Sequence, residues 1–361
     1  SDLRGTWDEN SFTFSVTAQG IGLKGTLEVE ADALKFDGRL PLIAMPFSPW
    51  IARVLKKSLE QNVARIDETE TRKLAGDNTT DAAYSNTTDT NHGDNGDAPP
   101  VVLFLHIPKA GGQTLGEYVY NQCRRGEARE DDLLNAGVAY LTYGFLKEPE
   151  LALPEHVRPL LQRRDLRAVI GHFWFGLHEH VARPSTYITL LRHPLERVVS
   201  LYYYAKLSET MSLEEFVRSP PFKEVDNDQT RRLAGVDPEI GACTHETLRA
   251  AKENLRRHFS VVGTVERFDE TLVLLKRRLG WTREIISYPR NVNAARQPTA
   301  SLSPEVLAAV LKRNELDFEL WQYAAQLLDE AIAGEGAEFY AELERYNSLR
   351  AASPEANAPP S

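Results

Sequence analysis

Apolar and polar residues are distributed so that the chain divides into three main parts. Over residues 11–16, 23–29 and 34–40 the two kinds alternate, which predicts three strands within a small module that spans residues 1–61. Apolar residues then recur between Ile51 and Leu59 at the spacing of one helix face. Residues 62–99 are rich in Asp, Asn, Thr and Gly, which predicts a flexible polar linker. Residues 100–347 form the predicted main domain, and 348–361 a disordered tail.

The main domain alternates short apolar runs with helical patterns. The runs at 101–105, 166–170, 187–191 and 261–265 predict buried strands. The predicted helices span 114–124, 195–205 and 271–279, and two or three further helices cover 304–332 and 335–345. Such alternation predicts an α/β fold with a mainly parallel sheet covered by helices on both faces. Ligands of these sheets bind beyond the carboxyl ends of the strands, where Lys109, His172 and Arg192 fall.

The first of these strand ends continues as HIPKAGGQTL, residues 106–115. A glycine pair between a strand and a helix aims backbone N–H groups at one point, and the helix dipole and Lys109 add positive potential. This combination predicts a phosphate site. It differs from a Walker A sequence because Lys109 precedes the glycines instead of following them.

A second phosphate site is predicted where Arg192 ends a strand and Ser200 follows eight residues later in the next helix. An arginine fork and a hydroxyl can bind one phosphate together. A nucleoside triphosphate would also need a metal-binding Asp at a strand end, and the strands end in His172, Arg192 and Glu266. A nucleotide that carries phosphates at both its 5′ and 3′ positions fits better. Arg197, in the same helix, is predicted to pair with solvent or another domain.

Composition limits the partners and the cellular compartment that we expect for this protein. The 361 residues carry a formal net charge of −10, which argues against nucleic acid as a partner. No apolar run approaches the roughly 20 residues of a membrane span, and the N-terminus lacks a signal-peptide pattern. Two distant cysteines, Cys123 and Cys243, favour a reducing compartment. We therefore expect a cytoplasmic protein without a transmembrane segment.

Residues 101–345 resemble the sulfotransferase family that includes the heparan sulfate 2-O- and 6-O-sulfotransferases. The resemblance rests on residues 106–115 and on LRHPLERVVS at 191–200, with further similarity at 171–173, 226–231 and 263–268. It implies a P-loop-like sulfotransferase domain that uses 3′-phosphoadenosine 5′-phosphosulfate (PAPS) as sulfate donor. The acceptor that it implies is a hydroxyl group, with a carbohydrate as the expected bearer.

The resemblance also implies roles for single residues. Lys109 would stabilise the leaving oxygen and His172 would act as general base, with His178 as the alternative base and no metal required. Four polar residues are predicted to line the acceptor cleft, and a loop at 290–296 is either a cover for the nucleotide or a plain connection. The acceptor residues are Asn227, Gln229, Thr230 and Arg231. The predicted nucleotide-binding residues are Lys109, Ala110, Gly111, Gly112, Gln113, Thr114, Leu115, Arg192 and Ser200.

The first 61 residues resemble the polyhydroxyalkanoic acid system proteins. Trp7-Asp8 before the first predicted strand, the strand at 25–29 and Leu40-Pro41 carry this likeness. It implies an accessory module that binds a protein or a granule surface. Two other functions remain open for the main domain: a P-loop nucleotide kinase or NTPase, and a non-catalytic scaffold that only binds nucleotide.

Overall fold

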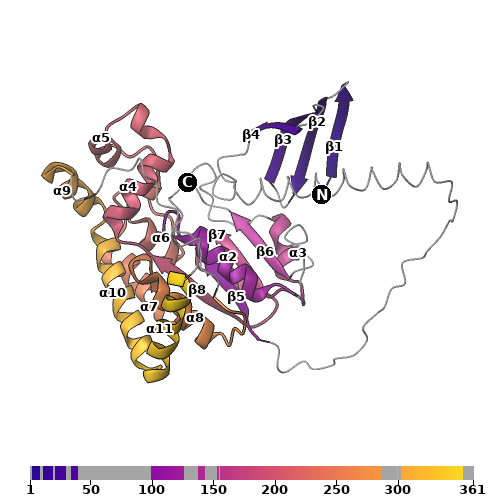
Figure 1. Cartoon of the computed structure of the whole chain (residues 1–361). Helices are drawn as coiled ribbons and strands as arrows, with labels where there is room; N and C mark the ends of the chain where they lie inside the picture. Colours follow the sequence, from indigo (N-terminus) through magenta and orange to yellow (C-terminus); the bar gives the residue numbers. More distant parts are fainter. Residues whose placement is uncertain are drawn as a thin grey trace, which may run out of the picture. The chain divides into compact units, whose positions relative to one another are not determined.

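The computed structural model describes residues 2–8, 11–18, 21–29, 34–39, 99–125, 137–142, 153, 155–285, 299 and 302–352. These residues belong to two compact units, one with the strands before residue 40 and one from Pro100 onward (Figure 1). Four predicted features lie outside the described residues. They are the helix at 51–59, the linker at 62–98, the loop at 290–296 and the tail from residue 353.

The N-terminal unit contains a four-stranded antiparallel sheet in the order β1-β2-β3-β4. The strands are Asp2–Asp8, Ser11–Ala18, Ile21–Val29 and Leu34–Arg39. Apolar positions are in register across it, since Trp7 pairs with Phe12, Phe12 with Leu27, and Leu27 with Phe36. The three predicted strands are confirmed. The prediction that Trp7-Asp8 precede the first strand is wrong, because both residues belong to β1.

The second unit is built on a five-stranded sheet in which every neighbouring pair is parallel. Its order is β6-β7-β5-β8-β9. The strands are β5 (Val101–Leu105), β6 (Val138–Thr142), β7 (Ala168–His172), β8 (Ser185–Leu191) and β9 (Phe259–Thr264). The predicted α/β class and four of these strands are confirmed, whereas the edge strand β6 was not predicted.

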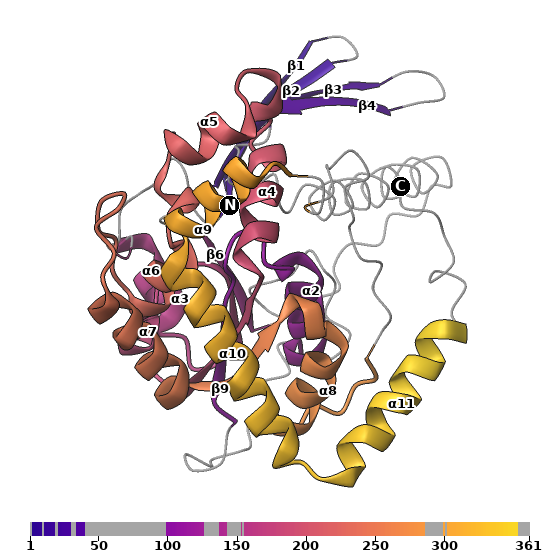
Figure 2. The same cartoon turned by 90° about the vertical axis from the view of Figure 1, so that its left-hand side faces the viewer.

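Helices cover both faces of this sheet, which explains why its strands are apolar on both sides (Figure 2). On one face, α2 (Gly112–Cys123) places Gly116 against Ile170 and Phe104. On the same face α8 (Phe268–Arg278) packs so closely that a Cβ on Gly263 would lie 2.2 Å from Thr271.

The opposite face is covered by α7 (His245–His258) and α10 (Glu315–Ala333). Leu103 of the sheet, Leu255 of α7 and Leu320 of α10 belong to the same buried core. A second core lies among α4 (Pro194–Tyr204), α5 (Leu213–Arg218) and α9 (Pro304–Arg313). The remaining helices are α3 (Arg158–Leu161), α6 (Asp228–Ala234) and α11 (Ala337–Ala352), and short 3₁₀ turns include η3 (Leu177–His180) and η6 (Val265–Arg267).

Two or three closing helices were predicted, and the described chain has three, because residues 304–332 form α9 and α10, separated at Asn314, before α11. The predicted tail needs correction. The tail predicted from residue 348 is helical as far as Ala352, because α11 continues to that residue. Among the helices that the structure describes, none has the length and apolarity to cross a bilayer.

The N-termini of α6 and α10 cap each other. Asn227 Oδ1 accepts the backbone N–H groups of Leu316 and Asp317, each at 3.1 Å. In return the Asp317 carboxylate accepts the N–H of Gln229 at 3.2 Å and that of Thr230 at 2.8 Å. Each side chain thus satisfies helix-end donors that have no partner within their own helix. This reciprocal cap fixes the start of α6, which lies next to the candidate site.

Candidate functional site

The candidate site lies where the strand order of the parallel sheet reverses. The chain begins at the central strand β5, adds β6 and β7 on one side, and then adds β8 and β9 on the other. The carboxyl ends of β5, β7 and β8 are therefore neighbours at the switch point, the usual ligand crevice of such sheets. Lys109, His172 and Arg192 follow or end these three strands.

The loop after β5 turns twice through the left-handed region before α2 begins. Lys109 has φ 67° and Gly111, the N-cap of α2, has φ 69°. No side chain of the described residues caps this helix, and its first turn contains no acidic residue. The first N–H groups of a helix and the positive end of its dipole together favour an anion at such a position. Around them Gly111 and Gln113 are exposed, Thr114 is half-buried, and Ala110, Gly112 and Leu115 are buried.

The loop lies directly on a buried histidine. A Cβ on Gly112 would be 1.8 Å from His106 Nε2, so only glycine fits at this position. The His106 ring in turn lies 4.2 Å from the His172 ring, centroid to centroid. The glycine pair therefore brings the loop onto the pair of histidines at the ends of β5 and β7.

Lys109 extends its side chain over α4. Its Nζ lies 4.0 Å from the centroid of the Tyr204 ring, which is a cation–π contact. Burial raises the pKa of Tyr204 to about 12, so the ring remains a neutral phenol at physiological pH. The ammonium group thus lies against an aromatic face at the end of the loop.

Arg192 is bound to the Lys109 loop itself. Its Nη1 donates to the backbone carbonyl of Lys109 at 3.0 Å, and its Nη2 pairs with Glu196 at 3.3 Å. Glu196, Ser200 and Tyr204 recur every four residues in α4, so they share one helix face. Since Glu196 contacts Arg192 and Tyr204 contacts Lys109, the half-buried Ser200 lies on the face that serves both cations.

His172 is buried at the end of β7, with 1% of its surface exposed. Its Nδ1 lies 2.8 Å from the carbonyl oxygen of His106, which can only accept, so Nδ1 carries the proton. Burial, followed by the charge of Arg232, lowers the pKa of His172 to about 3. The ring is therefore neutral at physiological pH, and its Nε2 has the lone pair that a general base requires.

His178, the alternative base, lies elsewhere. It belongs to η3, and its Nδ1 is 3.1 Å from the hydroxyl of Tyr187, near the amino end of β8. Its ring is 5.0 Å from that of His258, the residue before β9. The structure therefore places His178 near the amino ends of β8 and β9, while Lys109 follows a carboxyl end. Among the described residues, no group of three His, Cys, Asp or Glu side chains is arranged to bind a metal ion.

The four residues predicted to line an acceptor cleft are buried and occupied by other contacts. Asn227 and Thr230 take part in the reciprocal cap with α10. Gln229 bonds to the backbone of Arg192, and Arg231 pairs with Asp226 at 2.7 Å. Gln229, Thr230 and Arg231 have no exposed surface. Their burial does not support direct contact with an acceptor, because their polar groups already bind the protein.

Arg197 also differs from its prediction. It is fully buried and pairs with Asp228 at 3.2 Å, and Arg232 pairs with the same carboxylate at 3.0 Å. Arg232 lies 4.8 Å from the ring centroid of Trp174 and lowers the pKa of His172. Arg197 and Arg232 therefore stabilise the protein beneath the site.

Glu266 in η6 is a site residue whose role the sequence did not reveal. One of its oxygens accepts the His193 N–H at 2.9 Å and the other accepts the indole N–H of Trp321 at 3.1 Å. It fixes the turn after Arg192 from the end of β9. The sequence motif at residues 263–268 could have indicated this role, because it spans the end of β9, the strand next to β8.

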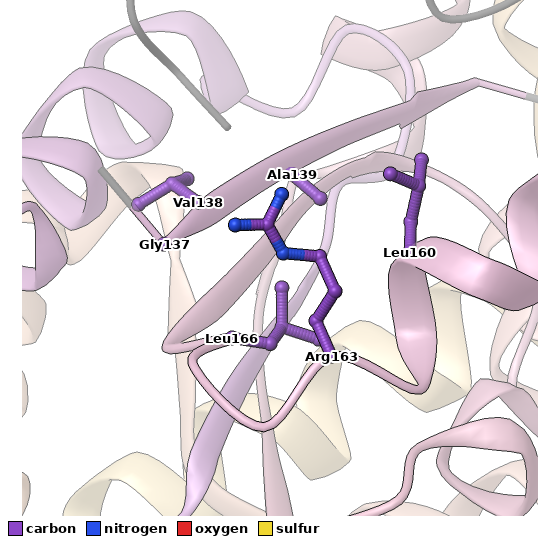
Figure 3. A pocket seen from close by; sticks show the side chains of 6 residues that line it. All are labelled: Gly137, Val138, Ala139, Leu160, Arg163 and Leu166. Carbon is purple, nitrogen blue, oxygen red and sulfur yellow. The ribbon is translucent and has the colours of Figure 1, made fainter. Parts of the chain in front are cut away.

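A small hollow lies at the other edge of the sheet (Figure 3). It is bordered by Gly137 and Val138 at the start of β6 and by Arg163, whose side chain lies across it. Arg163 is paired with Asp165 at 2.7 Å. The hollow is therefore separate from the strand ends that carry Lys109 and Arg192.

The parallel sheet has a lysine-glycine loop after its central strand β5 and an arginine after the neighbouring strand β8, an architecture of the P-loop-like α/β class. Residues 71–355 match the galactose-3-O-sulfotransferase family, and the chain belongs to that family. The predicted sulfotransferase family is thus confirmed. The N-terminal module, residues 1–61, precedes the matched residues, so its resemblance stays a prediction.

Curated relatives agree with this family. Human galactose-3-O-sulfotransferase 2 is 26% identical over 251 residues, which are 64% of this chain and 61% of the relative. Human heparan-sulfate 6-O-sulfotransferase 1 is 24% identical over 288 residues, covering 64% of this chain and 66% of the relative. Galactosylceramide sulfotransferase of Bos taurus is 31% identical over 160 residues, 40% of this chain and 38% of the relative. The chain spans slightly less than two thirds of the first two relatives.

Proposed function

We propose that this protein is a sulfotransferase that moves a sulfuryl group from PAPS to a carbohydrate hydroxyl, with a galactoside as the first acceptor to test. The observation that carries the proposal is the bond from Arg192 Nη1 to the Lys109 carbonyl at 3.0 Å. It joins the two predicted phosphate motifs at one switch point, as a nucleotide with two separated phosphates requires. Family membership and the names of the relatives support the reaction class and the galactoside.

The residues of the site fit such a nucleotide. The N–H groups at the start of α2 and Lys109 would hold the 5′-phosphate, and Arg192 with Ser200 the 3′-phosphate. PAPS supplies the activated sulfuryl group on its 5′-phosphate. The new bond joins the acceptor oxygen to sulfur, and the bond from sulfur to the bridging phosphate oxygen breaks.

Lys109 would act where negative charge grows on that bridging oxygen. Its ammonium group lies beside the Tyr204 ring at the loop before α2, where its positive charge would stabilise that oxygen. His172 would take the proton of the acceptor hydroxyl at Nε2, since Nδ1 is bonded to the His106 carbonyl. Because His172 is buried, this assignment requires the acceptor hydroxyl to approach the end of β7 closely.

Calorimetric titration separates the proposal from its alternatives. We expect adenosine 3′,5′-bisphosphate to bind at least about tenfold more tightly than ATP with magnesium, because only the bisphosphate places charge at both Arg192 and Lys109. Tighter binding of ATP with magnesium would instead support a nucleotide kinase or NTPase. Tight binding of bisphosphate without transfer to any acceptor would support a scaffold.

Transfer itself is tested with labelled PAPS and a panel of acceptors. The panel contains terminal galactosides, a galactolipid, an N-sulfated heparan chain, a tyrosine peptide and a simple phenol. The His172→Ala variant is expected to lose about 10²–10⁴-fold in turnover, whereas His178→Ala should retain it. Normal turnover of the His172 variant would assign the base to another residue.

Two further predictions remain for this protein. A cytoplasmic location is a proposal that fractionation of expressing cells would test. A role of the first 61 residues in binding a protein or a granule surface would be tested by pull-down and granule sedimentation with and without that module.

A further inference from the structure

Gln229 lies in the first turn of α6 and has no exposed surface. Its side-chain amide makes two bonds to a single residue at the end of β8. Oε1 accepts the backbone N–H of Arg192 at 2.9 Å, and Nε2 donates to the carbonyl of Arg192, also at 2.9 Å. The amide thus pairs with this backbone as a neighbouring strand would.

This pairing occurs where the sheet can no longer supply it. β8 ends at Leu191, and its register with β9 ends at Leu191 and Thr264. A backbone N–H and C=O left without partners at this depth would be costly, and Gln229 satisfies both. The backbone of Arg192 is therefore fixed in direction before any ligand arrives.

Gln229 is itself held from the opposite side. Its own N–H donates to Asp317 at 3.2 Å, so the first turn of α6 is attached to α10. From this support the guanidinium of Arg192 reaches the Lys109 carbonyl at 3.0 Å. A continuous series of bonds thus connects α10, Gln229, Arg192 and the loop before α2.

We propose that Gln229 is a positioning residue that holds Arg192 for the 3′-phosphate of the nucleotide and so determines the preference for a 3′-phosphorylated ligand. This inference rests on the proposed function. Gln229 does not contact the ligand. Its effect on binding is transmitted through the Arg192 backbone, because prior fixation of the arginine removes the ordering cost that binding would otherwise carry.

The test compares two nucleotides that differ only in the 3′-phosphate. Adenosine 3′,5′-bisphosphate and adenosine 5′-phosphate are titrated calorimetrically into the full chain, and the ratio of their dissociation constants is the readout. In Gln229→Met, which keeps the volume and removes both bonds, the ratio should fall at least about fivefold, because Arg192 must then be ordered when the 3′-phosphate binds. Affinity for adenosine 5′-phosphate should change less than about twofold, since Arg192 does not serve that phosphate.

Two variants control the experiment. Gln122→Met removes an amide that donates to the Arg283 carbonyl at 2.8 Å, beyond the far end of α2, and should keep the wild-type ratio. Gln229→Glu keeps an acceptor for the Arg192 N–H and loses the donor, so its ratio should lie between wild type and Met. If Gln229→Met does not fold, the Glu variant decides by the same ratio.

The possible outcomes are distinct. An unchanged ratio in a folded Gln229 variant, or an equal loss for both nucleotides, would overturn the positioning role. A wild-type protein without preference for the bisphosphate would instead overturn the proposed function, because the ratio would then be close to one before any substitution.

Discussion

The carboxyl edge of the parallel sheet and the segment from Asp226 to Arg232 both contain several charged side chains. The two regions differ in the groups that contact their cations. At the edge, Lys109 lies on an aromatic ring, and Arg192 is bonded to a carbonyl and to a partly exposed Glu196. In the segment, Arg231 and Arg232 are fully buried and each is paired with carboxylates. The fully buried cations of the segment are paired inside the protein and serve the architecture, whereas the partly exposed cations of the edge lie at the strand ends where ligands of such sheets bind.

The largest expected effect lies in the buried segment. Asp228→Ala leaves Arg197 and Arg232 without their shared carboxylate, and the free energy of unfolding should fall by about 3–5 kcal/mol. Urea unfolding measures this loss. Glu246→Ala is the control, because its pair with Arg249 is exposed and should be worth less than about 1 kcal/mol. Similar losses in both variants would mean that the buried pairs of Asp228 contribute no more to stability than an exposed pair does.

At the edge the effect should appear in activity and not in stability. Lys109→Ala is expected to lower the rate of sulfuryl transfer about 10²–10³-fold, as loss of a charge-stabilising group does. Its unfolding midpoint should stay near that of wild type, because the side chain is only half-buried. Lys206→Ala, an exposed lysine just after α4, is the control and should keep its rate. A normal rate in Lys109→Ala would mean that the edge is not the reacting site.

The pH dependence of stability tests His172, which ends a strand at the sheet edge and is influenced by Arg232 of the buried segment. The pKa of His172 is about 3 in the folded protein, below 6.5 for a free histidine, so protons bind preferentially to the unfolded chain between these values. Stability should therefore be lost as pH falls through this window, by about 2 kcal/mol between pH 6.5 and 5 from His172 alone. Burial also lowers the pKa of His106, which acts in the same direction.

The His172→Gln variant isolates this contribution. It should lose about 2 kcal/mol less than wild type between pH 6.5 and 5, measured as urea unfolding at each pH. Parallel profiles for the two proteins would show that His172 does not titrate as its burial implies.

The smallest effect concerns the ring beneath Lys109. Tyr204→Leu removes the cation–π contact, worth about 0.5–2 kcal/mol, and should slow transfer about 2- to 30-fold. Tyr204→Phe keeps the aromatic face and should remain near the wild-type rate, which initial-rate kinetics with saturating donor would determine. Equal rates in the Leu and Phe variants would mean that the ring does not position the lysine.

The elements that the sequence predicted well are those with unambiguous local signals. The apolar runs of β5, β7, β8 and β9 each end in, or are followed directly by, a polar residue. Pro194 marks the start of α4. Helix α7 was missed although Leu248, Ala251 and Leu255 recur at helical spacing. The edge strand β6, with the sequence VAYLT, was also missed.

In the site, the positions of Lys109 and Arg192 at neighbouring strand ends could be predicted because strand ends and glycines are local features. The contacts of residues 227–231 could not, because Asn, Gln, Thr and Arg suit a sugar as well as a helix end. Their partner Asp317 lies 88 residues from Gln229 in sequence. Local composition contains no sign of such a distant partner.

The reciprocal cap between α6 and α10 has a consequence for how the protein is made. A ribosome delivers the chain from its N-terminus, so the Lys109 loop and the Arg192 turn emerge long before Asp317. Until then α6 has neither the Asp317 acceptors for its first N–H groups nor a fixed position for Gln229. The support of Gln229 is therefore completed late in synthesis, and a nascent chain that stops short of α10 carries both predicted phosphate motifs before that support exists.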